Sequence, residues 1–591
     1  MTIHFTRTED GVSKLKDTRV ASTKLDKCVV PMRRPFDCIP VEILTQIFEY
    51  ATEFKEMDSP VGVDIRRYGY YYLQTCVTSF SLGSIMRVCC HWRAVALNTP
   101  DLWRRVDVYG HVEPLAAALS RSRNKTIDVS LHRVSGAQLA LPLLAAHSHR
   151  LRKLSLHWLD DIKDNGELCQ LCQDLMDQVV RMEFPALEEL LVDDGETYSL
   201  GEVYGLDLYL DPDWLPSLRI VRLDTVYVSW NSMIFSQLRV LHLQEVAVPG
   251  EEEISLSTFL DVLAECQSLE ELTLVLAFPL AFPNFQRGSI PEGPFAGPVV
   301  ELPKLRLLHL EWDSVWRTPC ETYQILQHLR LQPQATVRIV VEYDRTTDPT
   351  KSLLDVVPRD PTCLPILTAG TSVQVFVAER DFTQFAVGST PESREFALLL
   401  ANNSSRDWPQ RYGVDQQLRD FCTLFADAPV THLSIDTDGF GAAGLQPSFC
   451  LLRHLTTIQV NFEALDALKQ LLDAIASSPS PSPSPPSASS AGPEETPSDA
   501  DDTCNVVVPQ LRTLKLKTLP WHLELLSDIE RCLQWRFERG TELEELYIEV
   551  YGREKDTEGE VEMELRHTTQ LVALQMQVNG SVVFVDAPRP S

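Results

Sequence analysis

The sequence contains no uninterrupted apolar stretch long enough to cross a membrane. Its most apolar segment, residues 272–285, is broken by Pro279 and Pro283 and is shorter than the roughly 20 residues that span a bilayer. The N-terminal residues lack the apolar core of a secretory signal. We therefore expect no transmembrane helix, no membrane partner, and a location in the cytoplasm or the nucleus.

The sequence also has fewer basic than acidic residues. The 591 residues include 53 lysines and arginines against 83 aspartates and glutamates, which gives a formal net charge of −30. Because proteins bind nucleic acid largely through lysine and arginine, this balance argues against a nucleic-acid partner and favours a basic protein. The 14 cysteines show neither the density nor the regular spacing of a disulfide scaffold, which is typical of a reducing compartment.

Specific catalytic motifs are missing as well. We find no P-loop, no H-E-x-x-H zinc motif and no G-x-S-x-G nucleophile elbow. The segment most similar to a known enzyme motif is the G-x-G-x-x-G of residues 439–444, a pattern that can bind a dinucleotide. Asp436 and Asp438 would place negative charge beside the phosphates, and Pro447 leaves a following helix of only about eight residues. A glycine loop between structural repeats is favoured, with an enzyme that uses this loop as an alternative.

The spacing of potential metal ligands is incomplete. Cys169 and Cys172 form one C-x-x-C pair, but a structural zinc site needs four ligands and no second pair accompanies this one. We place both cysteines in an amphipathic helix as small core residues. The sequence therefore predicts no catalytic residue, no metal ligand and no cofactor.

The N-terminal part of the chain predicts a tail followed by short helices. Residues 1–34 are polar and locally basic, and we interpret them as a flexible tail. Apolar residues then recur at the spacings of three and four that are typical of one helix face, namely Ile39, Ile43, Leu44, Ile47 and Phe48. A second amphipathic segment follows at residues 82–96 and stops before Pro100.

From about residue 127 onward one short pattern recurs. It reads leucine, a charged residue, any residue, an aliphatic, any residue, an aliphatic, and chance would supply about one instance. Eight instances begin at Leu151, Leu187, Leu218, Leu238, Leu269, Leu305, Leu511 and Leu543. Such spacing is typical of units that each contain a strand, a loop and a helix, as in leucine-rich repeats. Most turns lack the Asn or Cys of a regular leucine-rich repeat, so we expect an irregular array.

Residues 477–503 interrupt this array. They are dominated by serine, proline and acidic residues and contain no aliphatic residue beyond alanine, so they cannot bury enough surface to offset the entropy of ordering. We predict a disordered insertion. Five proline-directed sites leave both a phosphorylation role and a mere spacer role open: Ser478, Ser480, Ser482, Ser484 and Thr496.

The two helical segments together resemble a known domain. The string IPVEIL at residues 39–44, the pair Ile47 and Phe48, and the string VCCHWRAVALNTPDLW at residues 88–103 are similar to the F-box-like domain, in the form common in basidiomycete fungi. The resemblance covers about residues 36–106. The chain departs from the family pattern at Ile39, where leucine is usual, and in an interval of about 30 residues between the two halves.

The resemblance implies a partner and a role. In this family a three-helix module docks on the Skp-type linker of a cullin-based ubiquitin ligase, and a C-terminal repeat domain holds the substrate. Carried over to this chain, the linker interface would consist of Ile39, Pro40, Ile43, Leu44, Ile47, Val88, Trp92 and Trp103. Such a small helical module buries little by itself, so a partner groove would cover its surplus apolar surface.

We therefore predict an α+β protein. A small all-α F-box-like module at residues 35–106 would precede an irregular α/β leucine-rich-repeat-like solenoid at residues 107–591, which contains the insertion. The predicted function is that of a non-enzymatic substrate adaptor in an SCF-type cullin ubiquitin ligase. The alternative is a leucine-rich-repeat scaffold or binding protein without a ligase role. The protein substrate is unknown, and position alone suggests as its contacts Arg152, Lys153, Arg219, Arg239, Arg306 and His309.

Overall fold

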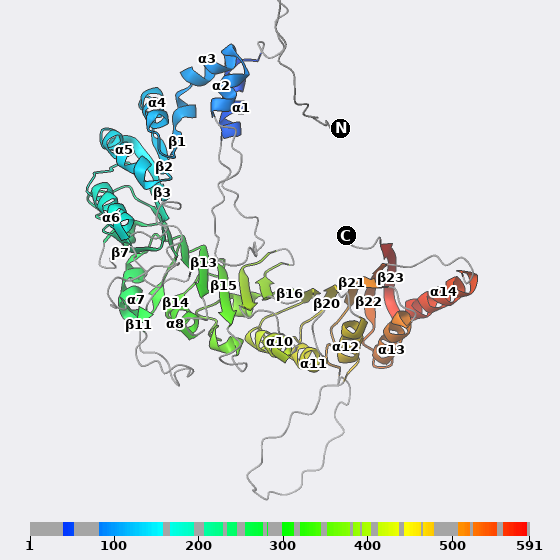
Figure 1. The fold of residues 1–591 in the computed structure, drawn as a ribbon. Helices are drawn as coiled ribbons and strands as arrows, with labels where there is room; N and C mark the ends of the chain where they lie inside the picture. Colours follow the sequence, from blue (N-terminus) through cyan, green and yellow to red (C-terminus); the bar gives the residue numbers. More distant parts are fainter. Residues whose placement is uncertain are drawn as a thin grey trace, which may run out of the picture. The chain divides into compact units, whose positions relative to one another are not determined.

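The structure is a computed structural model that describes most of the chain (Figure 1). The described residues are 39–52, 82–157, 166–193, 206–228, 233–244, 254–275, 280–281, 298–312, 320–343, 352–378, 382–390, 393–402, 412–436, 442–461, 465–477, 506–520, 524–551 and 560–587. The predicted tail at residues 1–34 lies outside them, as do the interval at 53–81 and all of the predicted insertion except residue 477.

The chain divides into two compact units, Met1–Leu102 and Trp103–Ser591. The described helices of the first unit are α1 (Val41–Thr52), α2 (Leu82–Val88) and α3 (Cys90–Asn98). A 3-10 turn, η2 (Pro100–Trp103), crosses the boundary between the units. The first unit is therefore helical in its described part, and it ends a few residues before the predicted limit at residue 106.

Local chemistry explains where these helices begin and end. α1 starts directly after Pro40, whose carbonyl accepts the Leu44 N–H (3.0 Å). The second amphipathic segment forms two helices, α2 and α3, because Cys89 between them is extended (φ −160°, ψ 169°). The Cys89 Sγ accepts the Trp92 N–H (3.4 Å) and so caps α3. At the other end of α3 the Thr99 hydroxyl donates to the Val95 carbonyl (2.8 Å).

The described residues of the second unit are built on a 17-stranded sheet. Every pairing in it is parallel except those of β17, which is antiparallel to both of its neighbours. The pairings give the spatial order β1 (Arg105–Val108), β2 (Ile127–Leu131), β3 (Leu151–His157), β4 (Glu189–Asp193), β6 (Ile220–Asp224), β8 (Val240–Gln244), β10 (Glu271–Val275), β13 (Leu307–Trp312), β15 (Thr336–Tyr343), β18 (Phe396–Asn402), β17 (Phe382–Gly388), β16 (Ser372–Ala378), β19 (His432–Asp436), β20 (Thr457–Asn461), β21 (Thr513–Pro520), β22 (Leu543–Tyr551) and β23 (Val578–Ala587).

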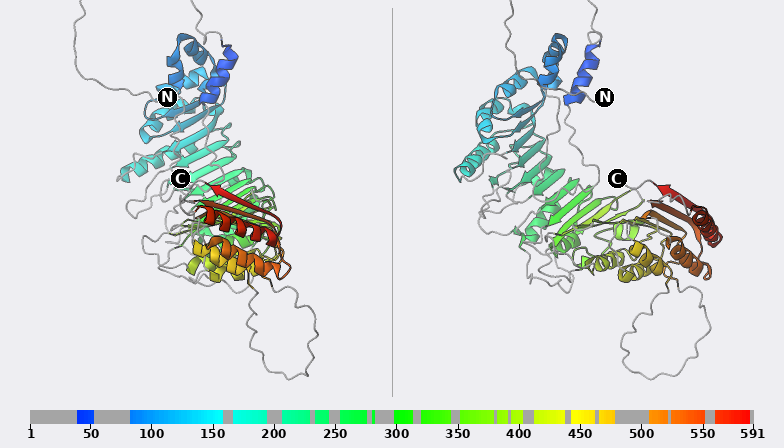
Figure 2. Two further views of the ribbon diagram at one scale, coloured as in Figure 1. Left: turned by 90° about the vertical axis from the view of Figure 1, so that its right-hand side faces the viewer. Right: turned by 45° about the vertical axis from the view of Figure 1, so that its right-hand side comes forward.

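Helices cover one face of this sheet (Figures 1 and 2). They are α4 (Glu113–Arg121), α5 (Val134–Ala145), α6 (Gly166–Val180), α7 (Leu256–Glu265), α8 (Cys320–His328), α9 (Ile366–Ala369), α10 (Tyr412–Leu424), α11 (Ala442–Leu451), α12 (Leu465–Ile475), α13 (Leu525–Phe537) and α14 (Glu560–Gln577). Three short parallel pairs supplement them: β5 (Leu206–Leu208) with β7 (Val226–Val228), β9 (Ile254–Ser255) with β11 (Leu280–Ala281), and β12 (Val300–Glu301) with β14 (Leu329–Arg330). The remaining 3-10 turns are η3 (Ser148–Arg150), η5 (Met233–Gln237) and η7 (Leu353–Asp355).

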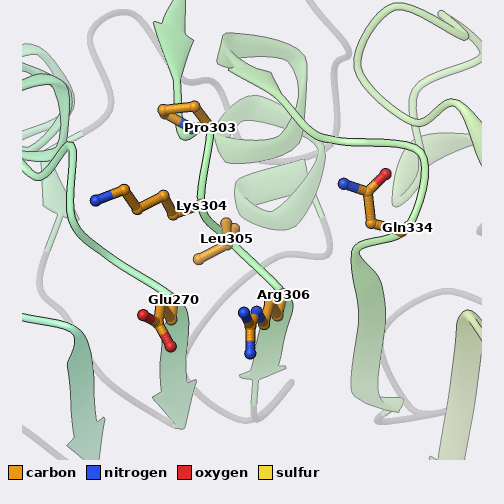
Figure 3. Close-up of a pocket in the computed structure, with 6 residues that line it drawn as sticks. All are labelled: Glu270, Pro303, Lys304, Leu305, Arg306 and Gln334. Atoms are coloured by element: carbon orange, nitrogen blue, oxygen red, sulfur yellow. The ribbon is translucent and has the colours of Figure 1, made fainter.

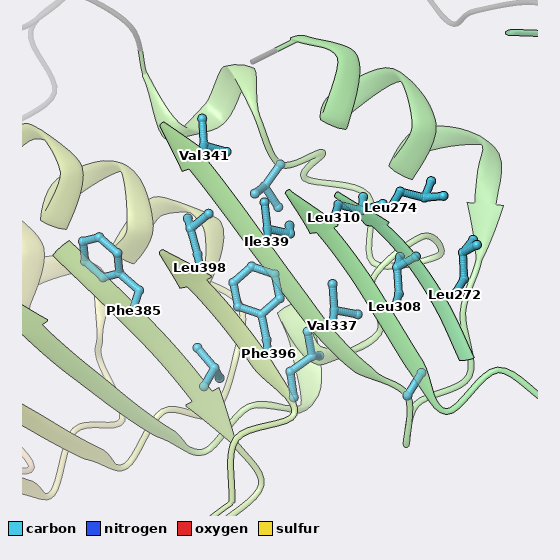
Figure 4. Close-up of a cluster of buried hydrophobic side chains, with 14 of the residues drawn as sticks. Leu272, Leu274, Leu308, Leu310, Val337, Ile339, Val341, Phe385, Phe396 and Leu398 are labelled. Carbon is cyan, nitrogen blue, oxygen red and sulfur yellow. The ribbon is translucent and has the colours of Figure 1, made fainter. Parts of the chain in front are cut away.

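The recurring leucine pattern corresponds to the strands and their core residues. The first leucine of each instance lies just before or at the start of a strand and is at most 1% exposed. The two following aliphatic positions point between the sheet and the helices, as Figure 4 shows for β10 and β13. The aliphatic residues of β15, which lacks the pattern, point the same way. There the side chains that are at most 2% exposed are Leu272, Leu274, Leu308, Leu310, Val337 and Ile339. Alternation along each strand therefore leaves the other set of side chains on the face opposite the helices, which we call the strand face.

One segment breaks the parallel order. β16, β17 and β18 follow each other along the chain without a helix between them, so they pair antiparallel as neighbours. The turn before β18 is held by Glu395, which accepts the Ser389 N–H (3.0 Å) and the Ser389 hydroxyl (2.6 Å). As a result β15 pairs with β18 rather than with β16. Within the described part of the chain, no helix is long and apolar enough to cross a membrane.

Candidate functional site

Helix α1 carries two apolar faces. Leu44 and Phe48 are 0% and 1% exposed and form the core of the helical unit. Ile43 and Ile47 are 46% and 45% exposed, although they are as apolar as the core residues, and Tyr50 continues the same face one turn on. An apolar face that the unit does not cover itself is typical of a surface that meets a partner.

The other predicted interface residues are exposed to different degrees. Pro40 is exposed at the start of α1, and Val88 is exposed at the end of α2. Ile39 and Trp92 are half-buried. The Trp92 ring packs against the ring of Phe48, with 5.0 Å between centroids and 59° between planes. The structure thus gives Trp92 a core contact in addition to any partner contact.

Two predicted interface residues are buried within the chain. Leu44 is completely buried against its own unit, because it lies on the core face of α1. Trp103 is 7% exposed and begins the second unit, where the Arg121 guanidinium lies over its ring at 4.3 Å from the centroid. Both side chains are held mainly by contacts within the chain, and their part in the linker interface stays a prediction.

Comparison with protein families decides what this unit is. Residues 36–109 match the F-box-like family. The chain contains an F-box-like domain. The match includes all three described helices and η2 and continues into β1, which is slightly beyond the predicted limit at residue 106. None of the curated proteins compared with the chain matches it.

The suggested substrate contacts lie on two surfaces of the second unit. From Arg152 to Arg306, the charged second residues of the leucine pattern form a row along the N-terminal edge of the sheet. Each one from Glu188 onward donates its backbone N–H to the carbonyl of its predecessor. Arg239 donates to Arg219 O (2.7 Å), Glu270 to Arg239 O (2.7 Å) and Arg306 to Glu270 O (2.7 Å). The side chains of Arg239 and Glu270 also form a two-fold hydrogen-bonded pair (2.9 and 3.0 Å), which lowers the pKa of Glu270. Arg152 begins the same row.

A shallow depression of about 260 Å³ lies at this edge (Figure 3). Its lining consists of Glu270, Pro303, Lys304, Leu305, Arg306 and Gln334. It is smaller than the roughly 300–1,000 Å³ of pockets that enclose small-molecule ligands. The depression therefore fits contact with a protein surface better than capture of a cofactor.

The strand face carries paired charges. Lys153 contacts Glu189 (2.8 Å), and Glu189 also accepts from Arg222 (2.5 Å). His157 lies 3.3 Å from Asp193 at the C-terminal ends of β3 and β4. These pairs join neighbouring strands and so hold the face together.

Further titratable groups of the strand face are half-buried or buried, and of those described next only His309 was among the suggested contacts. Burial, with Arg222 and His309 as further causes, lowers the pKa of His242 to about 4, so this imidazole is neutral at physiological pH. The Nε2 of His309 lies 3.5 Å from a Glu311 carboxylate oxygen. His242 was not predicted, and its only signal in the sequence is its alternate position in β8.

The glycine motif and the cysteine pair do not form a described site. Gly439 and Gly441 lie outside the described residues, whereas Gly444 lies in α11 against Asp415 of α10. α11 continues through Pro447 to Leu451, so the predicted early stop of this helix is corrected. Cys172 is buried in α6, and the side chain of Cys169 lies outside the described part. Among the described residues, no three His, Cys, Asp or Glu side chains gather as metal ligands would.

Proposed function

We propose that this protein is a substrate-recognition adaptor of an SCF-type cullin ubiquitin ligase. The F-box-like domain would bind a Skp-type linker, and the second unit would bind a protein substrate. The observation that carries the proposal is the F-box-like match, together with the exposed apolar face of α1 inside the matched residues. The adaptor would supply no chemical group and would act by raising the effective concentration of a substrate lysine near the ubiquitin-loaded enzyme.

The linker interface would consist of the exposed and half-exposed members of the predicted set, Ile39, Pro40, Ile43, Ile47, Val88 and Trp92. Ile43 and Ile47 are its centre, because they are neighbours on one helix face and nearly half of each is open to solvent. Covering the exposed half of each isoleucine would contribute about 1 kcal/mol to binding. Leu44 and Trp103 would support the interface only indirectly.

The second unit would be an irregular leucine-rich-repeat-like array. Support comes from the repeated sequence pattern, from parallel strands that add in sequence order on both sides of the β16–β18 segment, and from helices on one face only. Unequal helices and the antiparallel β17 account for its irregularity. The strand face and the N-terminal edge would then be the surfaces open to a protein substrate.

Co-purification tests this function against a scaffold without a ligase role. The full chain would be co-expressed with a Skp-type linker and purified through a tag on the chain. An adaptor brings down the linker at one-to-one stoichiometry, and Leu139→Lys, a change of an exposed residue on α5, leaves that recovery unchanged. Absence of the linker from the purified wild-type chain would favour the scaffold.

A further inference from the structure

The two edge strands of the described sheet differ in character. β1 is only four residues long and carries Arg105 and Asp107, and short charged edges discourage the addition of a further strand. β23 is ten residues long, and among the described residues it pairs with β22 alone. Residues 567–585 contain no Asp, Glu, Lys or Arg, although 23% of the whole chain is charged. β23 is thus a long, nearly uncharged edge.

Gln575, in the last turn of α14, occupies part of this edge. Its Nε2 donates to Gly580 O (2.8 Å), and its Oε1 accepts the Val582 N–H (3.3 Å). One side-chain amide therefore meets a backbone acceptor and a backbone donor two residues apart, as the peptide group of a neighbouring strand would.

The hydrogen bonds of β22 show that the backbone groups bonded to Gln575 lie on the side of β23 away from β22. Glu545 pairs in register with Ser581, but it donates its own N–H to Arg512 O on the opposite side (3.0 Å). Successive residues of a strand direct their N–H and C=O groups to opposite sides. Ser581 therefore faces β22, and Gly580 O and the Val582 N–H face outward.

Apolar side chains of α14 and β23 are also exposed. Val572 and Met576 of α14 are 59% and 76% exposed, and Val583 of β23 is 37% exposed. A helix turns about 100° per residue, which places Val572 and Met576 away from the side on which Gln570 and Gln577 bond to α13. The left view of Figure 2 looks onto this end, where α14 and β23 lie side by side.

We propose that the outer edge of β23, with Val572 and Met576, is the surface through which two copies of this chain associate. The β23 strands of the two copies pair antiparallel across a two-fold axis, which lets the same backbone groups serve both copies. Two chains of net charge −30 repel each other, so association is least opposed where the surface carries no ionised side chain. Gln575 competes for the same backbone groups and so keeps the association weak and reversible.

Sedimentation velocity of the full chain over a wide concentration range tests the proposal. The wild type shows a reversible monomer–dimer equilibrium. Gln575→Ala frees the two backbone groups and tightens the dimer about tenfold, since each hydrogen bond contributes modestly to the net free energy. Gln577→Ala is the matched control, because its amide bonds to Gln534 on α13 instead of to β23, and it leaves the equilibrium unchanged.

Two further variants address the strand itself. Val583→Lys brings like charges together at the pairing site and weakens the dimer at least about tenfold. Val582→Pro removes the outward N–H but no bond to β22, so it weakens the dimer while circular dichroism stays that of the wild type. The proposal is overturned if the wild type and Gln575→Ala both remain monomers, or if a folded Val583→Lys or Val582→Pro chain dimerises as the wild type does.

Discussion

Asp224 lies on the strand face of β6 directly beside Asp193 of β4, with which it pairs in register. Burial, and next the charge of Asp193, raise the pKa of the Asp224 carboxyl to about 7, although the Thr225 hydroxyl donates to it (3.1 Å). The folded chain therefore holds this proton at pH values at which the unfolded chain has released it, because an aspartate in the unfolded chain titrates near pH 4.

The Asp224→Asn variant should reveal this proton. A raised pKa in the folded chain stabilises it fully below about pH 4, and the contribution is lost as the pH rises to about 7. Asparagine does not titrate, so the variant should gain about 1–3 kcal/mol over the wild type at pH 8.5 and clearly less at pH 5. Thermal unfolding at the two pH values measures the difference. The assignment would be contradicted if the stability difference between Asp224→Asn and the wild type were equal at both pH values. It would also be contradicted if the exposed Asp213→Asn control showed the same pH-dependent difference.

Neighbouring residues show how far the sequence predicts roles at this scale. Ile43 and Leu44 are adjacent and both apolar, and the spacing pattern predicted one helix face for them without separating their roles. Only packing against the other helices distinguishes the half-exposed Ile43 from the buried Leu44. The leucine pattern likewise specifies core positions and leaves the alternate positions free, so the half-buried His242 and Asp224 could not be anticipated.

At the scale of elements, the contact between α10 and α11 depends on Gly444. A Cβ at this position would lie 2.8 Å from the Cα of Asp415, which is closer than real Cβ contacts come, so the backbone of one helix would have to move. The sequence offered Gly444 as part of a dinucleotide-binding motif. The structure shows it instead as the residue that lets two helices approach closely.

Gly444→Ala should therefore destabilise the second unit by about 1–3 kcal/mol, although alanine is the better helix former. Gly136→Ala in α5 is the comparison. A Cβ at Gly136 would lie 3.1 Å from Gly110 N, its nearest atom, so the backbone would have to shift less. Calorimetric melting should rank the wild type above Gly136→Ala and Gly136→Ala above Gly444→Ala. A higher melting temperature for Gly444→Ala would show that the helices are not packed this closely.

The sequence predicted regular elements better than exceptions to them. Strands were expected at each leucine pattern, and the structure has them, since alternating aliphatics specify a half-buried strand. β17 and β18 carry no such pattern and were missed. Their antiparallel pairing depends on short connections and on the contacts of Glu395, which periodicity does not encode. Pro447 was expected to end a helix, yet α11 continues through it.

For the whole molecule, the Ser/Pro-rich insertion offers a test of how stability is distributed. Its composition lacks core-forming residues, and the entropy of closing a loop grows only slowly with length, by about 0.6 kcal/mol per doubling. Deleting residues 478–500 should therefore shift the melting temperature by no more than about 2–4 °C. Scanning calorimetry of the deletion and the wild type makes the comparison. A fall of many degrees would mean that the insertion contributes to the fold.

The central claim, that the F-box-like domain binds a Skp-type linker through the exposed face of α1, is tested most directly by calorimetric titration of the linker into the full chain. The double variant Ile43→Ser/Ile47→Ser should weaken binding by about 2 kcal/mol or more. It should also lower the free energy of unfolding by about 1–2 kcal/mol, because about half of each side chain is buried in the folded chain. Leu44→Ala, at a fully buried site, should lower stability by about 2–5 kcal/mol. Wild-type affinity for the linker in a folded Ile43→Ser/Ile47→Ser chain would contradict the account.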